Sequence, residues 1–256
     1  MEWKRGATSA QVIDNGYGPG NGAHQLAYPF FPFDVIVAKK TNSLIISDKM
    51  NRRVVRWPRR NGGASRETII SNIACVGLTM DKNGYLYVVD NEKHAVRRYR
   101  IGDTEGTVVV GGNGDGTRLD QLANPEYVFV DRDHSVYVSD VRNHRVMKWE
   151  EGAKQGIIVA GGQGQGNSLT QLDHPKGVVV DQLGTVYVAD WGNYRIMRWP
   201  KGATRGSVIA GGNDDGAQAN QLGLLEGLSF DRHGNLYVVD QSNSRVQKFS
   251  IEQMIN

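Results

Sequence analysis

The 256-residue sequence has a single cysteine, Cys75, so an intramolecular disulfide is excluded. It has only seven prolines, and no apolar run of about eighteen residues that could cross a membrane. The first residues, MEWKRGATSA, lack the apolar core of a signal peptide. Apolar residues nowhere recur at helical spacing over three turns. These absences predict a helix-poor chain without a membrane span, and they leave its cellular compartment open.

Glycine, by contrast, is abundant. The 32 glycines accompany many Val, Ile and Tyr residues, a composition typical of all-β proteins with tight turns. The net charge is only +3, from 30 basic and 27 acidic residues, and by itself indicates no polyanionic partner. A chain of this length can bury a large core as one domain. We therefore expect a single all-β domain.

A repeat of about 50 residues runs through the chain. In each copy an aspartate follows an alternating apolar strand, and an aromatic residue stands nine positions later. The aspartates are Asp48, Asp90, Asp140, Asp190 and Asp240. One period, as in the fourth copy, contains four short strand-like segments, at 177–181, 185–190, 195–199 and 207–212. Four-stranded units repeated without helices predict a β-propeller.

The two ends of the sequence complement each other. Residues 2–14 match 198–210, which hold the outermost strand of the fourth unit, and the chain ends after the third strand of the fifth. We therefore expect a monomeric, five-bladed β-propeller of four-stranded antiparallel blades spanning residues 1–256. An N-terminal strand at 3–14 would complete the last blade and remove an open sheet edge. The expected blades are 27–71, 72–111, 123–161, 173–211 and 223–250 plus 3–14.

Glycine-rich stretches separate the units, as in GGQGQGNSLTQL at 161–172. Similar stretches occupy 111–122 and 211–222. None continues into the Gly-Lys-Ser/Thr of a phosphate-binding loop, and no helix pattern follows. We interpret them as crossovers between blades, with Leu122, Leu172 and Leu222 packed between neighbouring sheets.

The segment HPKGVVVDQLGTVYVADWGNYRIMRW (174–199) and the Asn-His-Arg core of DVRNHRVMKW (140–149) resemble the NHL-repeat family of β-propellers. The resemblance implies the propeller fold for nearly the whole chain. Well-known members have six blades, whereas five repeats are found here. It says little about function, because propellers host many unrelated activities.

Asp-x-x-Asn-x-Arg corners recur after the second strand of most units. Their side chains can hydrogen-bond the backbone and one another, and a feature repeated in most blades is architectural rather than catalytic. We interpret them as structural: Asp140, Asn143 and Arg145; Asp190, Asn193 and Arg195; Asp240, Asn243 and Arg245.

The positions fourteen residues before the repeat aspartates begin the innermost strands and should encircle one mouth of a central channel. Four of them are polar: Asp34, Glu126, Lys176 and Glu226. Three carboxylates facing one lysine could hold a polar ligand or a cation such as Ca²⁺. They could equally form a solvated rim with one partial ion pair. Acid–base catalysis by the carboxylates is a further alternative.

A basic stretch lies at 49–60. It contains Lys49, Arg52, Arg53, Arg56, Arg59 and Arg60 and no acidic residue. Such a stretch can contact the phosphates of single-stranded RNA. Strand alternation, however, sends neighbouring arginines to opposite faces, which is typical of an ordinary solvated strand.

The six histidines show no H-x-H or H-x-x-x-H spacing and fall at different positions of the repeat, apart from His94 and His144, so we expect no zinc ring. No nucleophile–base pair stands out, and no catalytic residue is assigned. The sequence thus favours a non-enzymatic recognition scaffold that binds a protein or RNA partner through one face or the channel mouth. The alternatives are a metal-dependent or small-molecule-processing enzyme at the channel, and a sugar-binding propeller.

Overall fold

The computed structural model describes residues 20, 22, 32–59, 66–218 and 220–251. Within these ranges the chain forms β-strands joined by turns, with three short 3-10 turns that each span three residues. Among the same residues, no helix has the length and apolar character needed to cross a membrane. The all-β prediction is confirmed.

The strands pair antiparallel in five sheets, numbered one to five along the chain. Sheet one contains β1 (Val35–Ala38), β2 (Ser43–Asp48), β3 (Arg53–Pro58) and β4 (Glu67–Ser71). Sheet two contains β5 (Cys75–Met80), β6 (Leu86–Asp90), β7 (Ala95–Tyr99) and β8 (Thr107–Gly111). Sheet three contains β9 (Pro125–Val130), β10 (Val136–Asp140), β11 (Arg145–Trp149) and β12 (Ile157–Gly161). Sheet four contains β13 (Pro175–Val180), β14 (Val186–Asp190), β15 (Arg195–Trp199) and β16 (Ser207–Gly211). Sheet five contains β17 (Leu225–Phe230), β18 (Asn235–Asp240) and β19 (Arg245–Ser250).

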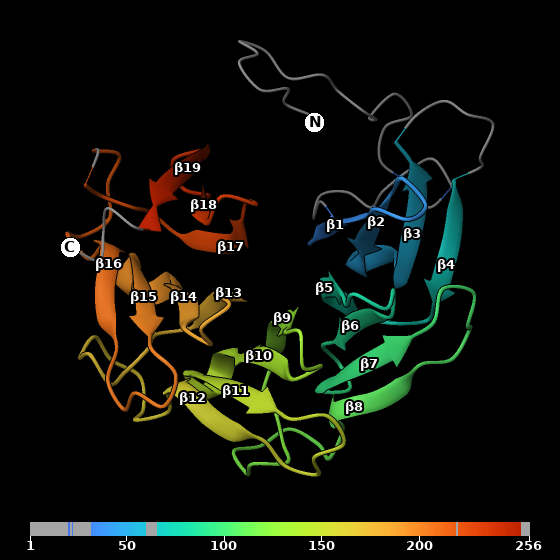
Figure 1. The fold of residues 1–256 in the computed structure, drawn as a ribbon, viewed down its shortest axis with the longest axis horizontal. Helices are drawn as coiled ribbons and strands as arrows, with labels where there is room; N and C mark the ends of the chain where they lie inside the picture. Colours follow the sequence, from blue (N-terminus) through green and yellow to red (C-terminus); the bar gives the residue numbers. More distant parts are fainter. Residues whose placement is uncertain (1–19, 21, 23–31, 60–65, 219, 252–256) are drawn as a thin grey trace.

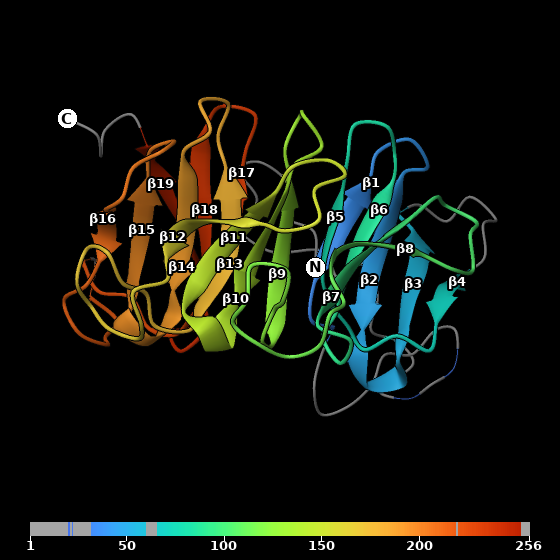
Figure 2. The same ribbon diagram turned by 90° about the horizontal axis from the view of Figure 1, so that it is seen from below.

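The sheets follow one another around a common centre, in chain order (Figure 1). The first strand of each sheet is innermost, and successive innermost strands contact each other from β1 to β5, β9, β13 and β17. Seen edge-on, the strands run roughly along the axis of the disc (Figure 2). This is the blade arrangement of a five-bladed β-propeller.

The hydrophobic core lies between neighbouring sheets rather than within one. Val138 and Met147 of sheet three are fully buried in one cluster with Val76 and Val89 of sheet two. Sheets three and four share a second cluster, which includes Leu172 of the crossover between them. Strands covered by a sheet on each side can be apolar on both faces, which explains the continuous apolar run of β13.

The glycine-rich stretches are crossovers, as predicted. Leu122 and Leu172 are 0% exposed and Leu222 is 1% exposed, each at the seam between two sheets. Gly161, with φ of 67°, shows why glycine is needed where each crossover begins. A Cβ atom there would lie 2.5 Å from the carbonyl oxygen of His144, in addition to the strain of the left-handed conformation.

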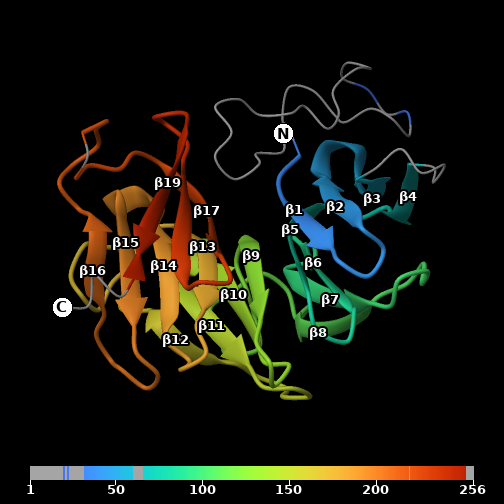
Figure 3. The ribbon, with the colours of Figure 1, turned by 45° about the horizontal axis from the view of Figure 1, so that its top comes forward.

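Sheet five differs from the others. Three of its strands fall within the described residues, and the strand predicted at 3–14 to complete it lies outside them. Figures 1 and 3 show an opening between sheet five and sheet one, as far as the described residues extend. Val246 on β19 is 64% exposed, whereas its counterparts Val54, Val96, Val146 and Ile196 are 0% exposed. No described segment therefore covers this face of sheet five.

This difference in burial predicts unequal costs for the same substitution. We expect Val146→Ala to lower the free energy of unfolding by about 2 kcal/mol, because it removes buried methyl groups. Val246→Ala should lower it by less than about 0.5 kcal/mol, as at an exposed position. Urea unfolding of both variants measures the two values. Equal losses would mean that another segment covers Val246.

Candidate functional site

The Asp-x-x-Asn-x-Arg corners fasten each crossover to its sheet. The Asp190 carboxylate accepts hydrogen bonds from the Asn193 side-chain amide (2.9 Å), from Arg195 Nε (2.6 Å) and from the backbone N–H of Asp173 (2.6 Å). The rest of the Arg195 guanidinium donates to crossover carbonyl oxygens within 167–171. Asp140 and Asp240 make equivalent contacts in sheets three and five. These groups are fully used in holding the fold.

The polar residues that begin the innermost strands come together at the same end of the disc as the corners. We call Asp34, Glu126, Tyr127, Lys176 and Glu226 the mouth cluster. Lys176 forms an ion pair with Glu126, and both side chains are largely buried. The Tyr127 hydroxyl donates to Glu226 Oε2 at 3.1 Å, although the two residues lie 99 positions apart. Sheets three, four and five thus share one polar network.

Asp34 adds a carboxylate from sheet one. Its oxygens accept the backbone N–H groups of Val35 and Leu78, each at 2.8 Å, and burial raises its pKa to about 6. Burial also raises the pKa of Glu226. The pKa of the Tyr127 hydroxyl is raised well above its ordinary value by burial and by Glu226, Asp34 and Glu126. Within the cluster, burial therefore disfavours the charged forms of the Asp34 and Glu226 carboxyl groups.

These contacts also bear on the expected cation. A Ca²⁺ ion held by all three carboxylates would bind groups that already accept hydrogen bonds from Lys176, Tyr127 and the backbone donors to Asp34. The expected Ca²⁺ site at the channel mouth stays a prediction.

Tyr127 was not among the predicted site residues. Sheets two, four and five carry glycine at its position, and Gly77 and Gly177 show why. A Cβ atom on Gly77 would lie 2.4 Å from the carbonyl oxygen of Glu126, because neighbouring innermost strands approach closely. In β9 the tyrosine ring instead packs against Phe33, with ring centroids 5.5 Å apart. The exception to the Pro-x-Gly pattern was the available signal in the sequence.

The basic stretch at 49–60 does not form one cationic face in its described part, 49–59. Arg53 is buried and bonds Asp48 at 2.8 Å. Arg52 pairs with Glu92 at 2.5 Å, and Arg56 pairs with Glu67. The remaining predicted residues are Lys49, which lies near the Phe33 ring, Arg59, which is partly buried, and Arg60, which lies outside the described residues.

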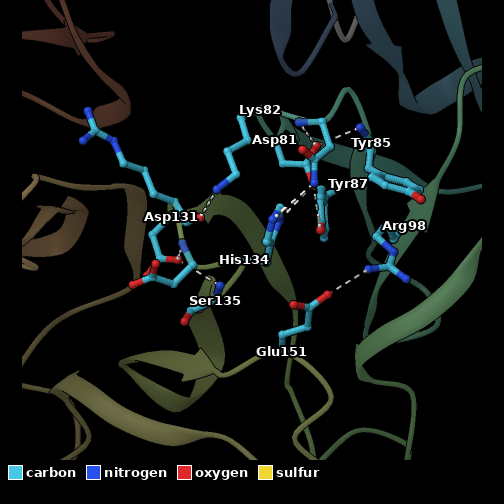
Figure 4. A network of polar contacts seen from close by, with 12 residues as sticks. Asp81, Lys82, Tyr85, Tyr87, Arg98, Asp131, His134, Ser135 and Glu151 are labelled. Carbon is cyan, nitrogen blue, oxygen red and sulfur yellow. Dashed lines mark hydrogen bonds and ion pairs between the residues drawn. The ribbon is translucent and has the colours of Figure 1, made fainter.

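At the opposite end of the disc, hairpin turns join the first and second strands of each sheet. Asp81 accepts the backbone N–H groups of Asn83 and Tyr85, each at 2.9 Å, and lies 3.1 Å from Nδ1 of His134 in the next hairpin (Figure 4). Asp131, Asp181 and Asp231 repeat the turn contacts. The Lys82 ammonium also donates to the Arg132 carbonyl at 2.9 Å. These two contacts, made by His134 and Lys82, connect sheet two to sheet three.

A cavity of about 1310 Å³ opens among these hairpins, and we call it the hairpin-side cavity. It is lined mainly by sheets three, four and five. Two edge-to-face aromatic pairs lie along it, Phe129 with Tyr137 and Tyr187 with Phe230. Its other walls include the exposed apolar residues Leu183, Ile157 and Ile158. None of these residues was assigned to a site from the sequence, because the hairpins come from separate repeats.

A further cluster of polar side chains, separate from the mouth cluster and the hairpin-side cavity, lies at the seam between sheets three and four. His144, Asp173 and His174 place one potential metal-ligand atom each within 4.8 Å of one another. The pKa of His144 is lowered by burial and by the neighbouring His174. The two imidazole rings meet nearly edge-to-face, with centroids 4.6 Å apart. Histidines from different positions of the repeat therefore come together, which their spacing in the sequence did not indicate.

Comparisons with known proteins identify the repeat and the fold. The family model for the NHL repeat matches residues 172–198. None of the curated proteins compared with the chain matches it. Among solved structures, an auxiliary nutrient binding protein from Bacteroides thetaiotaomicron aligns with a TM-score of 0.65 and 18% identity, over 84% of this chain and 57% of that one.

Two other structures are similar to the same extent. A gluconolactonase from Xanthomonas campestris aligns with a TM-score of 0.64 and 19% identity, over 84% of this chain and 74% of that one. A chain of the nidogen/laminin complex aligns with a TM-score of 0.63 and 21% identity, over 80% of this chain and 73% of that one. The chain spans little more than half the length of the nutrient-binding protein, and at these identities the likeness shows the propeller fold alone.

The raised pKa of Asp34 predicts a pH-dependent stability. The pKa is about 6 in the folded protein against 3.8 ordinarily, so the folded state binds more protons between these values. The free energy of unfolding should therefore fall as the pH rises through this window, by at most about 3 kcal/mol. Asp34→Asn should flatten this part of the profile, whatever its absolute stability.

Urea unfolding from pH 4 to pH 7.5 measures the profile. Asp133→Asn, at an exposed hairpin position, is the matched control and should keep the wild-type slope. Parallel profiles for the wild type and Asp34→Asn would show that Asp34 titrates normally.

Proposed function

Because the chain is an NHL-repeat β-propeller, we propose that it is a non-enzymatic recognition module whose hairpin-side cavity binds an extended, partly apolar segment of a protein partner. The observation that carries the proposal is the cavity itself. At about 1310 Å³ it exceeds the range of about 300–1,000 Å³ that is common for small-molecule sites. A hollow of this size suits a stretch of polypeptide.

The lining supports a protein segment as the ligand. The rings of Phe129 and Phe230 are half-buried, while Leu183 is 81% exposed beside them. Aromatic and aliphatic side chains on a rigid support are the usual anchors of protein interfaces. The ends of this surface belong to hairpins held by aspartate turns, so the cavity is largely formed before binding.

The charges around the cavity favour a protein over RNA. Lys82, Arg132 and Arg232 line it together with Asp131 and Asp231, so the lining carries charges of both signs. An RNA-binding face needs an excess of cations to meet the phosphates. In the basic stretch, Arg52, Arg53 and Arg56 are engaged with acidic partners, which are Glu92, Asp48 and Glu67 in that order.

Peptides selected by phage display on the wild-type protein would test the proposal. We expect Ile158→Asp and Leu183→Asp to weaken the binding of the selected peptides at least about tenfold, because each places a charge in the apolar lining. Val108→Asp is the matched control. Val108 occupies in sheet two the position that Ile158 occupies in sheet three, since it pairs with Arg97 as Ile158 pairs with Met147. The two side chains are similarly exposed, but Val108 does not line the cavity.

Fluorescence anisotropy of labelled peptides measures the affinities, with single-stranded RNA as a second probe. Unchanged peptide affinity in both cavity variants would contradict the proposal. So would RNA binding that weakens with salt and is lost in Arg52→Ala, because that result would place the partner on the basic stretch.

The mouth cluster favours a second candidate function, an enzyme acting on a small polar substrate. Asp34, with its pKa of about 6, is a carboxyl group suited to exchanging protons near neutral pH. Tyr127 and Glu226 lie beside it, and one of the similar structures is a gluconolactonase. Gluconolactone is therefore the first substrate to test.

If this second function holds, gluconolactone hydrolysis should rise as the pH passes about 6, because Asp34 must be ionised to accept a proton. Asp34→Asn and Glu226→Gln should lower the rate at least about 100-fold. Ile158→Asp, on the opposite side of the disc, should leave it unchanged. A pH-stat assay that detects no hydrolysis by the wild type above the buffer rate would exclude this substrate.

A further inference from the structure

We propose that His144, Asp173 and His174 form a binding site for a divalent transition-metal ion of the Zn²⁺ type, at the seam between sheets three and four. This site is separate from the hairpin-side cavity and does not depend on the proposed function. Two imidazoles and one carboxylate are a ligand set that zinc takes in proteins, with the fourth position left to water or a ligand.

The distances suit a metal after small side-chain movements. Asp173 Oδ1 lies 2.5 Å from His174 Nδ1 and 3.8 Å from His144 Nδ1. Ligand atoms around a tetrahedral zinc ion stand about 3.3 Å apart. The observed separations fall on either side of that value. Binding would also give up the 3.2 Å hydrogen bond from the His174 N–H to His144 Nδ1, because the metal takes the same lone pair.

The carboxylate is held in place by its surroundings. Its Oδ1 accepts a hydrogen bond from the Gln165 side-chain amide at 3.0 Å, and the Asp173 backbone N–H is fastened to the Asp190 corner. Gly192 lies against the carboxylate, and a Cβ atom there would stand 2.4 Å from Asp173 Cγ. A side chain at 192 would therefore push the carboxylate away. Such outer contacts orient metal ligands and raise affinity.

The cluster is not part of the repeating architecture. The strand registers Pro125↔Asp140, Pro175↔Asp190 and Leu225↔Asp240 fix which positions correspond. The position of Asp173 holds Ala123 before sheet three and Gly223 before sheet five. The residues equivalent to His174 at those two seams are Asn124 and Leu224. The residues equivalent to Gly192 in sheets three and five are Arg142 and Ser242. The ligands and the glycine that accommodates them thus occur together at one seam.

A metal ion can reach this seam from solvent. The side chains of His144 and Asp173 are 15% and 19% exposed, and that of His174 is 40% exposed. The histidines therefore stand at the surface end of the seam, with the Trp191 ring 6.1 Å from His174. The site combines a rigid, partly buried carboxylate with an open side for the ion.

Titration of ZnCl₂ into tag-free, chelator-treated protein, followed by calorimetry, tests the proposal. We expect one Zn²⁺ per chain with a dissociation constant in the micromolar range or below. Asp173→Asn, which keeps the size of the side chain, and His174→Ala should each weaken binding at least about tenfold. Zn²⁺ should also raise the unfolding temperature of the wild type more than that of Asp173→Asn.

His94→Ala is the matched control. His94 occupies in sheet two the position that His144 occupies in sheet three, with the same left-handed backbone, but Ala123 and Asn124 stand at its seam. This variant should bind Zn²⁺ as the wild type does. Absence of saturable binding below millimolar Zn²⁺, or equal affinity in Asp173→Asn and the wild type, would overturn the proposal. Equal weakening by His94→Ala would also overturn it.

Discussion

In sheets three, four and five, a buried aspartate accepts hydrogen bonds from an arginine, an asparagine and a backbone N–H at the end of the preceding crossover, and much of the structure depends on this corner. Asp190 and Asp140 are 0% exposed, so a lone carboxylate there would be strongly unfavourable. The arginine neutralises it and at the same time satisfies carbonyl oxygens of the crossover. Each of these corners therefore fixes where the innermost strand of its own sheet begins. The positions of Lys176 and Glu226, and hence the geometry of the mouth cluster, depend on it.

The two ends of the disc differ in the kind of side chain that they gather. At the corner end, crossovers descend between sheets and bring polar groups into partly buried positions, which perturbs the pKa values of Asp34, Glu226 and Tyr127. At the hairpin end, aspartate turns satisfy the backbone locally and leave aromatic and aliphatic side chains free to line a cavity. The polar mouth cluster and the partly apolar cavity are thus separated by the length of a strand.

Much of the fold followed from the sequence because its causes are local and repeated. Alternating apolar residues, turn glycines and the corner aspartates recur every 50 residues in sheets three to five, so each copy supports the interpretation of the next. The crossovers and the buried Leu122, Leu172 and Leu222 were predicted for the same reason. The strand expected at 3–14 stays a prediction. Among the described residues, the face of sheet five that carries Val246 departs from the burial pattern that the second and third strands of the other sheets share.

The sequence by itself determined the propeller, its repeat unit and the architectural role of the corners, since each repeat carries the same local signals. Only the tertiary structure decided which residues from different repeats meet. Tyr127 reaches Glu226 across 99 positions, and His144 joins Asp173 and His174 from the next repeat. Arg52 and Arg56 of the basic stretch likewise have acidic partners, on a neighbouring sheet and a neighbouring strand. Such contacts depend on how sheets pack around a centre, and no spacing along the chain encodes that packing directly.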